Sequence, residues 1–565
     1  MIGILSKPRQ ARVVEEFFEL FKTPWEFYRP ERTYDVIIAT ADTVPEVHPK
    51  LLVVYGPCTK DIDSRFGFEA GKRNQGAVLT TVDHILPVYG ALLTFAAGTC
   101  GNEQEAIPNP GGVSALTPQG AVIRLGYDLF DEVELLLTSG QPIEYAHVPT
   151  LDLHIMLLRK WIVQAGVAFV EIPPNPANHS FVACLTHDID FIGIRNHRFD
   201  HSMWGFVLRG TIGTLGRYFK GQLSFSNLVR SWMAVASLPL VYAGWIRDFW
   251  EPFQWYLAIE NGLPATYFLI PIKGRPGERV PGAHPSRRAA AYDVHEHAGQ
   301  VAALINRGCE VGLHGIDAWF RPDRGREERA AISDTTGSSI PGVRMHWLLH
   351  DESSPSVLEQ AGFTYDSSAG YNETVGYRAG TSQVFRPPTC EKLLELPLHI
   401  QDGALFYSGR LDLSEDQAEQ RCASMIAHAI TLGGAVTVLW HDRSHAPERF
   451  WGGFYQDLIG RLRSSGCWFG SAGQVVAWFQ KRRDVRFDAC PAGVRLHYEG
   501  EPIAPALRIR VHSPRSTRSR AGGGNQSWGG FTDICWTGDR DQQVDTEVSS
   551  LMLCTQDNSA GACLV

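Results

Sequence analysis

Eight short apolar runs follow one another between residues 181 and 470, and they constrain the fold more than any other feature of the chain. Helical patterns separate several of them, such as 298–307, 415–432 and 454–464. Strands that alternate with helices form a parallel sheet, because each helix carries the chain back to the start of the next strand. Seven or eight such repeats predict a distorted β/α barrel rather than an open sheet. The runs are 181–186, 265–271, 309–314, 342–346, 363–366, 393–398, 435–440 and 467–470.

A smaller α/β domain is predicted in front of the barrel, at residues 1–172, although its role does not follow from its residues. Its last helix is expected to start at Thr150, a plausible N-cap. The proline-rich segment Pro173-Pro174-Asn175-Pro176 then marks the domain boundary. The other expected elements are an amphipathic helix at 11–28, strands at 34–39, 51–55 and 121–125, and a helix at 128–137.

The barrel is expected to occupy residues 173–483, and two further segments follow it. Residues 484–512 are predicted to form a short β extension. Residues 513–565 are rich in Ser, Arg, Gly, Asp and Gln, a composition typical of disorder, so we predict a disordered tail.

Composition narrows the classes of function and compartment. The formal net charge of -9 argues against nucleic-acid binding, which needs a basic surface. The apolar run at the N-terminus is too short for a secretory signal, and no stretch is long and apolar enough to predict a transmembrane helix. The cysteines are scattered singly, without a metal-binding or disulfide-rich spacing. We therefore expect a cytoplasmic protein.

The segment 193–250, between the first and second barrel strands, is an insertion of unusual composition. It has seven Lys or Arg residues, two Asp residues and many aromatic residues. One interpretation is a helical hairpin that packs on the barrel. The other is a roof over the site, or a peripheral contact with a membrane or another acidic surface.

Polar side chains lie where the predicted barrel strands end, which is where chemistry is placed in such barrels. They are Asp188, Asp190, His314, Arg344, His346, Asp366 and His441. Carboxylate and imidazole ligands suit a divalent ion such as Zn²⁺, with Co²⁺, Ni²⁺ and Mn²⁺ as alternatives.

A catalytic ion needs about three protein ligands, and two of them are predicted to be an Asp of the first strand end and His314. His346 and Asp317 are the candidates for the third ligand, and His187 is a further one. Of the two aspartates, the one not bound to metal would be the general base. His441 would be the general acid, and Arg344 would pair with the base and hold it ionised. These parts predict metal-assisted hydrolysis of an acyl compound.

Four segments resemble the motifs of polysaccharide deacetylases of the carbohydrate esterase family four type. Leu185-Thr-His-Asp-Ile-Asp190 is similar to the first motif, usually Thr-Phe-Asp-Asp-Gly, and Glu310-Val-Gly-Leu-His-Gly315 to the second. Gly342-Val-Arg344 resembles the third, and Val438-Leu-Trp-His441 the last. The segments around 344–347, 365–368 and 377–381 look like a divergent bacterial branch that often carries an extra N-terminal domain.

By position, the resemblance implies that Asp188 is the catalytic base, His314 a metal ligand, Arg344 the base-orienting arginine and His441 the general acid. The usual metal carboxylate would fall on Ile189, so Asp190, one place further, is the expected ligand. The usual second histidine falls on Ala318.

Membership of this family implies a hydrolase that removes N- or O-acetyl groups from a sugar or glycan precursor. Two alternatives stay open: a carbohydrate-binding protein without catalysis, and a hydrolase of a linear amide that is not a sugar.

Overall fold

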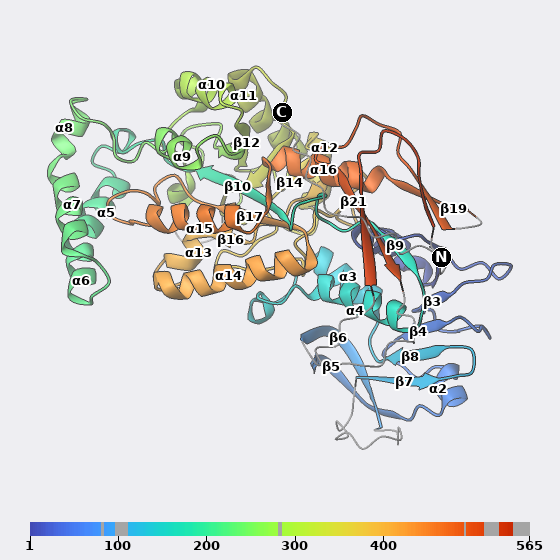
Figure 1. The fold of residues 1–565 in the computed structure, drawn as a ribbon. Coiled ribbons are helices and arrows are strands. Elements are labelled where there is room, and N and C mark those ends of the chain that lie inside the picture. Colours follow the sequence, from blue (N-terminus) through green and yellow to red (C-terminus); the bar gives the residue numbers. More distant parts are fainter. Residues whose placement is uncertain (81–83, 97–110, 281–284, 491–492, 514–529, 546–565) are drawn as a thin grey trace, which may run out of the picture.

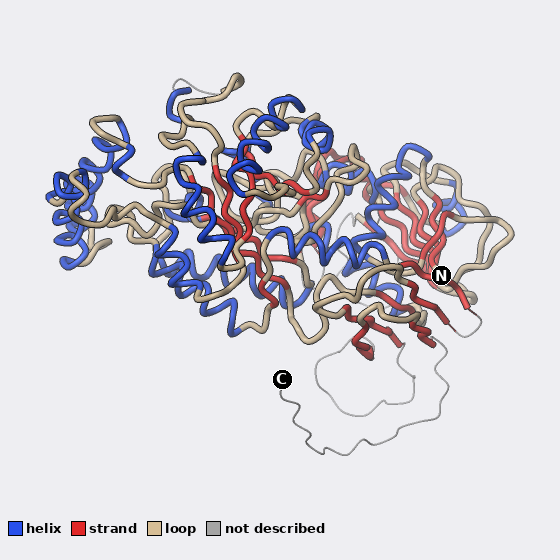
Figure 2. The backbone as a smooth tube through the Cα atoms, turned by 90° about the horizontal axis from the view of Figure 1, so that it is seen from above, coloured by secondary structure: helices blue, strands red, loops and turns tan. Residues whose placement is uncertain are grey.

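The computed structural model describes residues 1–80, 84–96, 111–280, 285–490, 493–513 and 530–545. A central β/α domain lies between a smaller α/β domain and a projecting helical hairpin (Figure 1). Seen from above, the strands of the central domain form a curled layer with helices outside it (Figure 2).

The central sheet is parallel throughout. Its strands follow the order β15-β14-β13-β12-β11-β10-β17-β16, and β18 pairs with the start of β10. Among the described residues no pairing joins β15 to β16, so the barrel is open at that point. The predicted distorted β/α barrel is thus confirmed. The strands are β10 (Val182–Ile189), β11 (Ala265–Leu269), β12 (Glu310–Gly315), β13 (Gly342–Met345), β14 (Tyr365–Asp366), β15 (Leu394–Glu395), β16 (Ile400–Gln401), β17 (Ala435–Leu439) and β18 (Trp468–Phe469).

Helices cover the outside of this sheet. α14 (Glu415–Leu432) has the predicted bounds, because Ser414 and Gln417 form a capping box at its start and Gly433 follows its end. α11 (Pro322–Thr336) was not predicted, since its run of charged residues has no apolar stripe and buries little beyond Gly325, Glu328 and Ile332. The remaining helices are α9 (Phe253–Glu260), α10 (Ala298–Asn306), α12 (Ser354–Ala361), α13 (Asp402–Phe406), α15 (Gly452–Ser464) and α16 (Ala472–Asp484).

β10 is the longest fully buried strand among the described residues. Every residue from Val182 to Ile189 is buried, and β11 and β17 flank it on both sides. It runs past the predicted end at residue 186, because His187 and Asp188 both find buried partners that keep them inside the protein. The strand therefore delivers its polar residues to the interior.

The N-terminal domain has a sheet with strand order β2-β1-β3-β4-β8-β7, in which only β7 is antiparallel. The predicted helix over 11–28 ends at Phe21, because Lys22 has a left-handed backbone, and residues 25–27 form a strand. Thr150 is not the N-cap: it is the first helical residue, and its hydroxyl donates to Gln141 Oε1. The elements are β1 (Ile2–Leu5), α1 (Ala11–Phe21), β2 (Trp25–Phe27), β3 (Val36–Ala39), β4 (Leu51–Tyr55), α2 (Asp61–Phe66), β5 (Ala70–Thr80), β6 (Ile85–Phe95), β7 (Gly112–Leu116), β8 (Ala121–Leu125), α3 (Leu129–Leu137) and α4 (Thr150–Gln164).

The prediction of a disordered tail from residue 513 is wrong for residues 530–545. β22 (Gly530–Trp536) pairs along the whole of β21 (Leu507–Ser513), and Asp533 forms an ion pair with Arg510 at 2.8 Å. β23 (Gln542–Asp545) pairs with β20 (Gly493–His497), which also pairs with β19 (Arg486–Cys490). The paired strands supply the backbone hydrogen bonds that composition alone does not reveal. Residues 514–529 and 546–565 lie outside the described residues.

β21 also pairs with β9 (Phe169–Glu171), at the end of the predicted N-terminal domain. Strands from before and after the barrel thus share one small sheet. The predicted boundary at 172/173 therefore lies directly after β9. The C-terminal extension supplies β21, the strand with which β9 pairs.

Candidate metal centre

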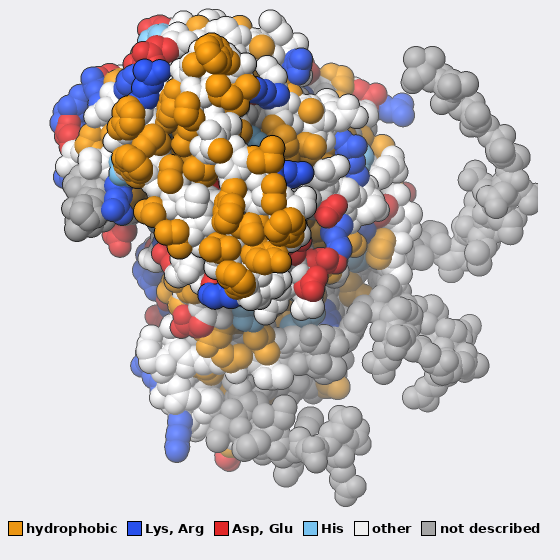
Figure 3. Space-filling view, turned by 90° about the vertical axis from the view of Figure 1, so that its left-hand side faces the viewer, with side chains coloured by type: hydrophobic (Ala, Val, Ile, Leu, Met, Phe, Trp, Pro, Cys, Tyr) orange, Lys and Arg blue, Asp and Glu red, His pale blue; other side chains and the backbone are white. Residues whose placement is uncertain are grey.

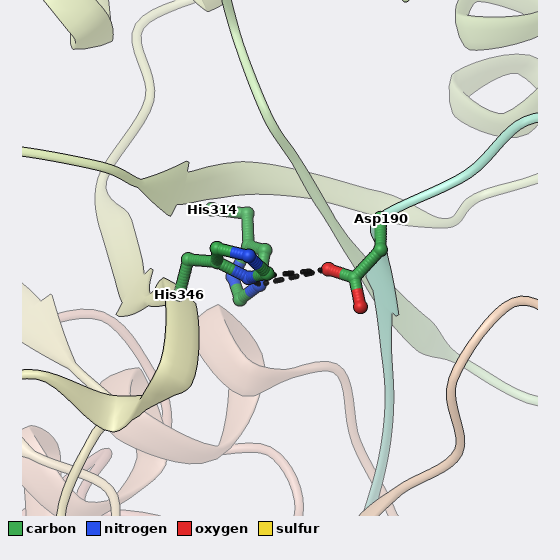
Figure 4. Close-up of side chains that lie close together, drawn as sticks. All are labelled: Asp190, His314 and His346. Carbon is green, nitrogen blue, oxygen red and sulfur yellow. Dashed lines mark hydrogen bonds and ion pairs between the residues drawn. The ribbon is translucent and has the colours of Figure 1, made fainter. Parts of the chain in front are cut away.

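Three side chains from three strand ends converge at one point (Figure 4). Asp190 follows β10, His314 lies on β12 and His346 follows β13. Asp190 Oδ1 lies 3.4 Å from His314 Nε2 and 3.2 Å from His346 Nδ1, and the two nitrogens are 2.9 Å apart. The three ligand atoms all lie within 4.8 Å of one another. The structure therefore brings together the three residues predicted as metal ligands.

Hydrogen bonds outside this cluster orient its ligand atoms. His314 Nδ1 donates to the carbonyl oxygen of Arg344 at 3.0 Å, which leaves the lone pair of Nε2 directed at Asp190. Arg288, which is buried, donates to the carbonyl oxygen of His346 at 3.1 Å. Such contacts fix the tautomer and the direction of ligating histidines in metal sites.

The protonation states of the cluster also suit a cation. Burial lowers the pKa of His346 to about 4, so its ring is neutral at neutral pH. Burial by itself would raise the pKa of Asp190, but His346 and His314 hold it well below its usual range. Asp190 Oδ1 is buried and accepts no hydrogen bond from the described residues. An ionised, unsatisfied carboxylate oxygen beside the neutral ring of His346 fits a divalent ion, because a metal needs deprotonated ligands.

The alternation of side chains along β10 separates the first-motif residues. Thr186, Asp188 and Asp190 lie on the inner face, whereas His187 and Ile189 point outward. This geometry agrees with the prediction of Asp190 rather than residue 189 as the ligand, because Ile189 faces away from the centre.

Asp188 lies beside the metal ligands, with Oδ2 3.8 Å from His314 Nε2. Arg344 Nη1 donates to Asp188 Oδ1 at 3.1 Å and to Thr186 Oγ1 at 2.6 Å. The other nitrogens of Arg344 donate to the carbonyl and hydroxyl oxygens of Ser367, so the guanidinium cannot turn away. Asp188 is therefore held on one side and left free on the side that faces the metal ligands.

His441 lines the same cavity and is paired with Asp402, a residue that the sequence analysis missed. Its Nδ1 lies 2.5 Å from Asp402 Oδ1, and its backbone N–H donates to Oδ2 at 2.8 Å. Burial alone would lower the pKa of His441, but Asp402, Asp190 and Asp188 together raise it to about 10. His441 thus carries a proton at neutral pH. Asp402 directly follows the two-residue strand β16 (Ile400–Gln401) and begins α13, so no apolar run of the kind that precedes Asp188 points to it in the sequence.

Three other predicted candidates do not join the centre. His187 is buried on the outer face, where Nε2 lies 2.6 Å from Glu260 Oε1 and Nδ1 is bonded to the Trp440 carbonyl, so it is not a metal ligand. Asp317 accepts from the backbone N–H of Glu278 and lies outside the metal cluster. Asp366 accepts from Ser368 and does not line the cavity.

A cavity of about 450 Å³ opens over the centre. Trp347 and Leu348, which directly follow His346, line it and have left-handed backbones with φ of 64° and 52°. Such strain is held at functional sites by the surrounding contacts. This left-handed backbone turns the chain immediately after His346. Trp347 therefore lies at the cavity, with 38% of its surface exposed.

Arginines form much of the cavity wall beyond the metal ligands. Arg449 is only 6% exposed, and its guanidinium lies over the rings of Tyr407 and Trp451. Arg443 lies 3.7 Å from the ring centroid of Phe191, and its Nε is buried without a hydrogen bond. Within the described residues, neither guanidinium has a carboxylate close enough for an ion pair. These two cations are available to an anion in the cavity.

Comparisons with known proteins find similarity only among solved structures. No protein-family model matches the chain, and no curated protein matches it. A protein from Mycobacterium smegmatis assigned as a polysaccharide deacetylase is 16% identical and covers 55% of this chain and 95% of its own, with a TM-score of 0.35. A protein from Pseudomonas aeruginosa PAO1 with the same assignment is 12% identical, covering 55% and 95%, with a TM-score of 0.34. Puue allantoinase is also 12% identical, covering 54% and 92%, with a TM-score of 0.32.

At these identities the activities of those proteins are not carried over to this chain, and its fold assignment rests on the strand order described above. Two of these similar structures are assigned as polysaccharide deacetylases, the family whose motifs four segments of this chain resemble.

Proposed function

We propose that the protein is a metal-dependent hydrolase that removes an acetyl group from an N-acetylated or O-acetylated sugar or glycan precursor. The observation that carries this proposal is the convergence of Asp190, His314 and His346 beside Asp188, with His441 on the same cavity. A divalent ion held by the three ligands, with Zn²⁺ favoured and Co²⁺, Ni²⁺ or Mn²⁺ as alternatives, would polarise the acyl carbonyl and acidify water.

The protein groups divide the proton transfers between them. Asp188 accepts the proton of the attacking water, and the hydrogen bond from Arg344 holds that carboxylate in position. His441, protonated and oriented by Asp402, donates a proton to the leaving nitrogen or oxygen. The general acid therefore begins the reaction with the proton that it has to donate.

Two alternatives use the same cavity. A carbohydrate-binding protein without catalysis would have no need of a protonated histidine aligned by a buried carboxylate, so the His441–Asp402 pair favours an enzyme. A hydrolase of a linear amide that is not a sugar would use the same groups, and only the substrate distinguishes it.

The arginines of the cavity wall favour a sugar that carries a phosphate or carboxylate group. Arg449 is buried and Arg443 is partly buried, and neither has an ion-pair partner in the described part of the chain, so a bound oxyanion would offset the cost of burying these charges. Arginine binds both oxyanions through paired hydrogen bonds. Sugar phosphates and uronic acids would thus be preferred over neutral sugars.

The test combines metal analysis with acetate release by the full chain. Purified protein is analysed for bound metal and incubated with N-acetylated sugars, O-acetylated sugars and linear acetamides, each with and without an acidic group. The proposal expects a bound divalent ion and acetate from the sugars, with Asp188→Asn retaining metal but losing activity. Absence of metal together with absence of acetate from every substrate would overturn it, and acetate from the linear acetamides alone would favour the second enzyme.

A further inference from the structure

The largest concentration of exposed apolar side chains lies on the helical hairpin of the insertion, here called the hairpin module (residues 201–242) (Figure 3). Its first arm is α5 (His201–Leu208), a π-helical turn (Arg209–Gly213) and α6 (Thr214–Phe219). Its second arm is α7 (Phe225–Ala236) and α8 (Leu238–Tyr242). The module projects from the barrel at the left of Figure 1, so most of both arms faces solvent rather than the barrel. The predicted helical hairpin therefore forms, but it does not lie flat on the barrel.

The exposed residues form one stripe along each arm. On the first arm they are Leu208, Ile212 and Phe219, exposed by 57%, 70% and 77%. On the second arm Phe225 and Met233 are 65% and 66% exposed. Soluble monomers rarely leave apolar patches of this kind uncovered. The stripes therefore need a partner.

The residues between the two arms are small or polar instead. Thr214 Oγ1 and Ser231 Oγ both donate to the carbonyl oxygen of Gly210, at 2.7 and 2.9 Å. A Cβ added at Gly210 would lie 2.9 Å from Val235, so only glycine allows this approach. Phe206 of the first arm and Ala234 and Val235 of the second belong to one apolar cluster. Helices whose outer surface lies against lipid have small residues where they contact each other and large apolar residues on the outer surface.

The charge of the module has the sign that anionic lipid requires. Arg209, Lys220 and Arg230 are exposed, and none forms an ion pair within the described part of the chain. The two acidic residues of the insertion are used internally: Asp200 caps α5 and pairs with His197, and Asp248 accepts from backbone N–H groups. A cationic apolar surface thus stands out on a chain of formal net charge -9.

We propose that the hairpin module docks on the surface of an anionic lipid bilayer, with its apolar stripes in the headgroup region. Among the described residues no helix is long and apolar enough to cross a membrane, so the contact would be an interfacial one. A second copy of the chain is a poorer partner, because a two-fold interface would bring the same unpaired cations together without acidic residues to meet them.

The base of the module is joined to the cavity wall. Trp250 and Ala446 share a buried cluster with Phe206, and Arg443 lies between Trp250 and Phe191, both of which contact its guanidinium. Docking would therefore hold the cavity close to the bilayer. The idea that the protein reaches its substrate at the bilayer rests on the proposed hydrolase function. The docking itself does not depend on that function.

The experiment is flotation of the full chain with vesicles of phosphatidylcholine alone or mixed with phosphatidylglycerol. Wild type should float with the mixed vesicles, and added salt should weaken the association. The triple variant Ile212→Gln/Phe219→Gln/Met233→Gln should bind at least about tenfold less. Lys220→Gln/Arg230→Gln should weaken binding to the mixed vesicles, by about fivefold for each charge.

A matched control removes three exposed apolar residues elsewhere: Leu116→Gln/Ile143→Gln/Ile430→Gln, which are 90%, 50% and 49% exposed in the wild type. It should float as wild type does, and circular dichroism should show all variants folded. Wild type that stays free of both vesicles, or a module variant that floats unchanged, would overturn the proposal. So would a dimer formed without vesicles that the module variant abolishes. Since none of these outcomes depends on catalysis, failure of the hydrolase proposal is distinguished from failure of this one.

Discussion

His441 and Asp402 make a two-point contact, because both the ring Nδ1 and the backbone N–H of His441 meet the same carboxylate. Ser444 donates to that carboxylate as well, and Tyr256 donates to the carbonyl oxygen of His441 at 2.6 Å. The imidazole is thus fixed in position and in protonation. General acids that are held in this way contribute substantially to hydrolysis near neutral pH.

Asp402→Asn should lower kcat by about 10²- to 10⁴-fold on any substrate that the wild type hydrolyses, because His441 loses its proton and its orientation. Metal content should stay unchanged, since Asp402 is no ligand. Kinetics and metal analysis of the same preparation check both statements, and full activity would remove His441 from the proton transfer.

The pH profile should change in the same variant. The folded pKa of His441, about 10, lies above its ordinary value, so acid-dependent activity should persist to high pH in the wild type. In Asp402→Asn the alkaline fall should move toward the ordinary histidine value of about 6.5. The free energy of unfolding should depend on pH in the same direction. The His441–Asp402 pair contributes its full stabilisation below about pH 6.5, and this stabilisation is lost as pH rises toward the folded pKa of His441. Unfolding free energies measured across this range provide the check.

Asp190→Ala and His346→Ala should each reduce bound metal from stoichiometric to trace amounts, because each removes one of the three candidate ligands that cluster among the described residues. Asp317→Asn is the matched control, since Asp317 is also buried nearby but bonds to the Glu278 backbone. Mass spectrometric analysis after dialysis measures the metal bound by each variant and by the control. Equal loss in the control would show that the cluster is not the binding site.

His187→Leu should destabilise the fold without affecting metal. The substitution breaks the buried pair with Glu260 and leaves that carboxylate with its two tyrosine donors, Tyr455 and Tyr267. We expect the free energy of unfolding to fall by about 3 kcal/mol. Denaturant unfolding measures this loss, and a variant that instead lost metal at unchanged stability would contradict the structural role.

Arg449→Met should raise KM about tenfold for a phosphorylated or carboxylated acetyl sugar, while KM for the neutral sugar stays unchanged. The expected difference follows from the guanidinium, which lies in the cavity wall without a carboxylate partner in the described structure. Arg378→Met, which changes an arginine that donates to the carbonyl oxygens of Gly370 and Ser139 rather than lining the cavity, is the control. Equal KM changes for both sugars would show that Arg449 does not read an acidic group.

The sequence by itself determined the parallel β/α architecture and the residues of the centre. Apolar runs such as 181–186 and 435–440 are buried on both faces, so their composition alone predicts strands of a covered parallel sheet. Because strand ends meet at one edge of such a sheet, the polar residues that follow them could be grouped before any contact was known. Helix 415–432 was bounded correctly for a similar reason, since its caps are local.

Only the tertiary structure decided which of these polar residues act together. His187 and Asp188 are neighbours in sequence, but strand alternation sends one to Glu260 and the other to Arg344. The choice of His346 over Asp317, and the pairing of Asp402 with His441, depend on contacts between segments about 30 to 40 residues apart. The outward apolar stripes of the hairpin module are likewise invisible to periodicity, because a period shows that a helix has an apolar side and not what that side faces.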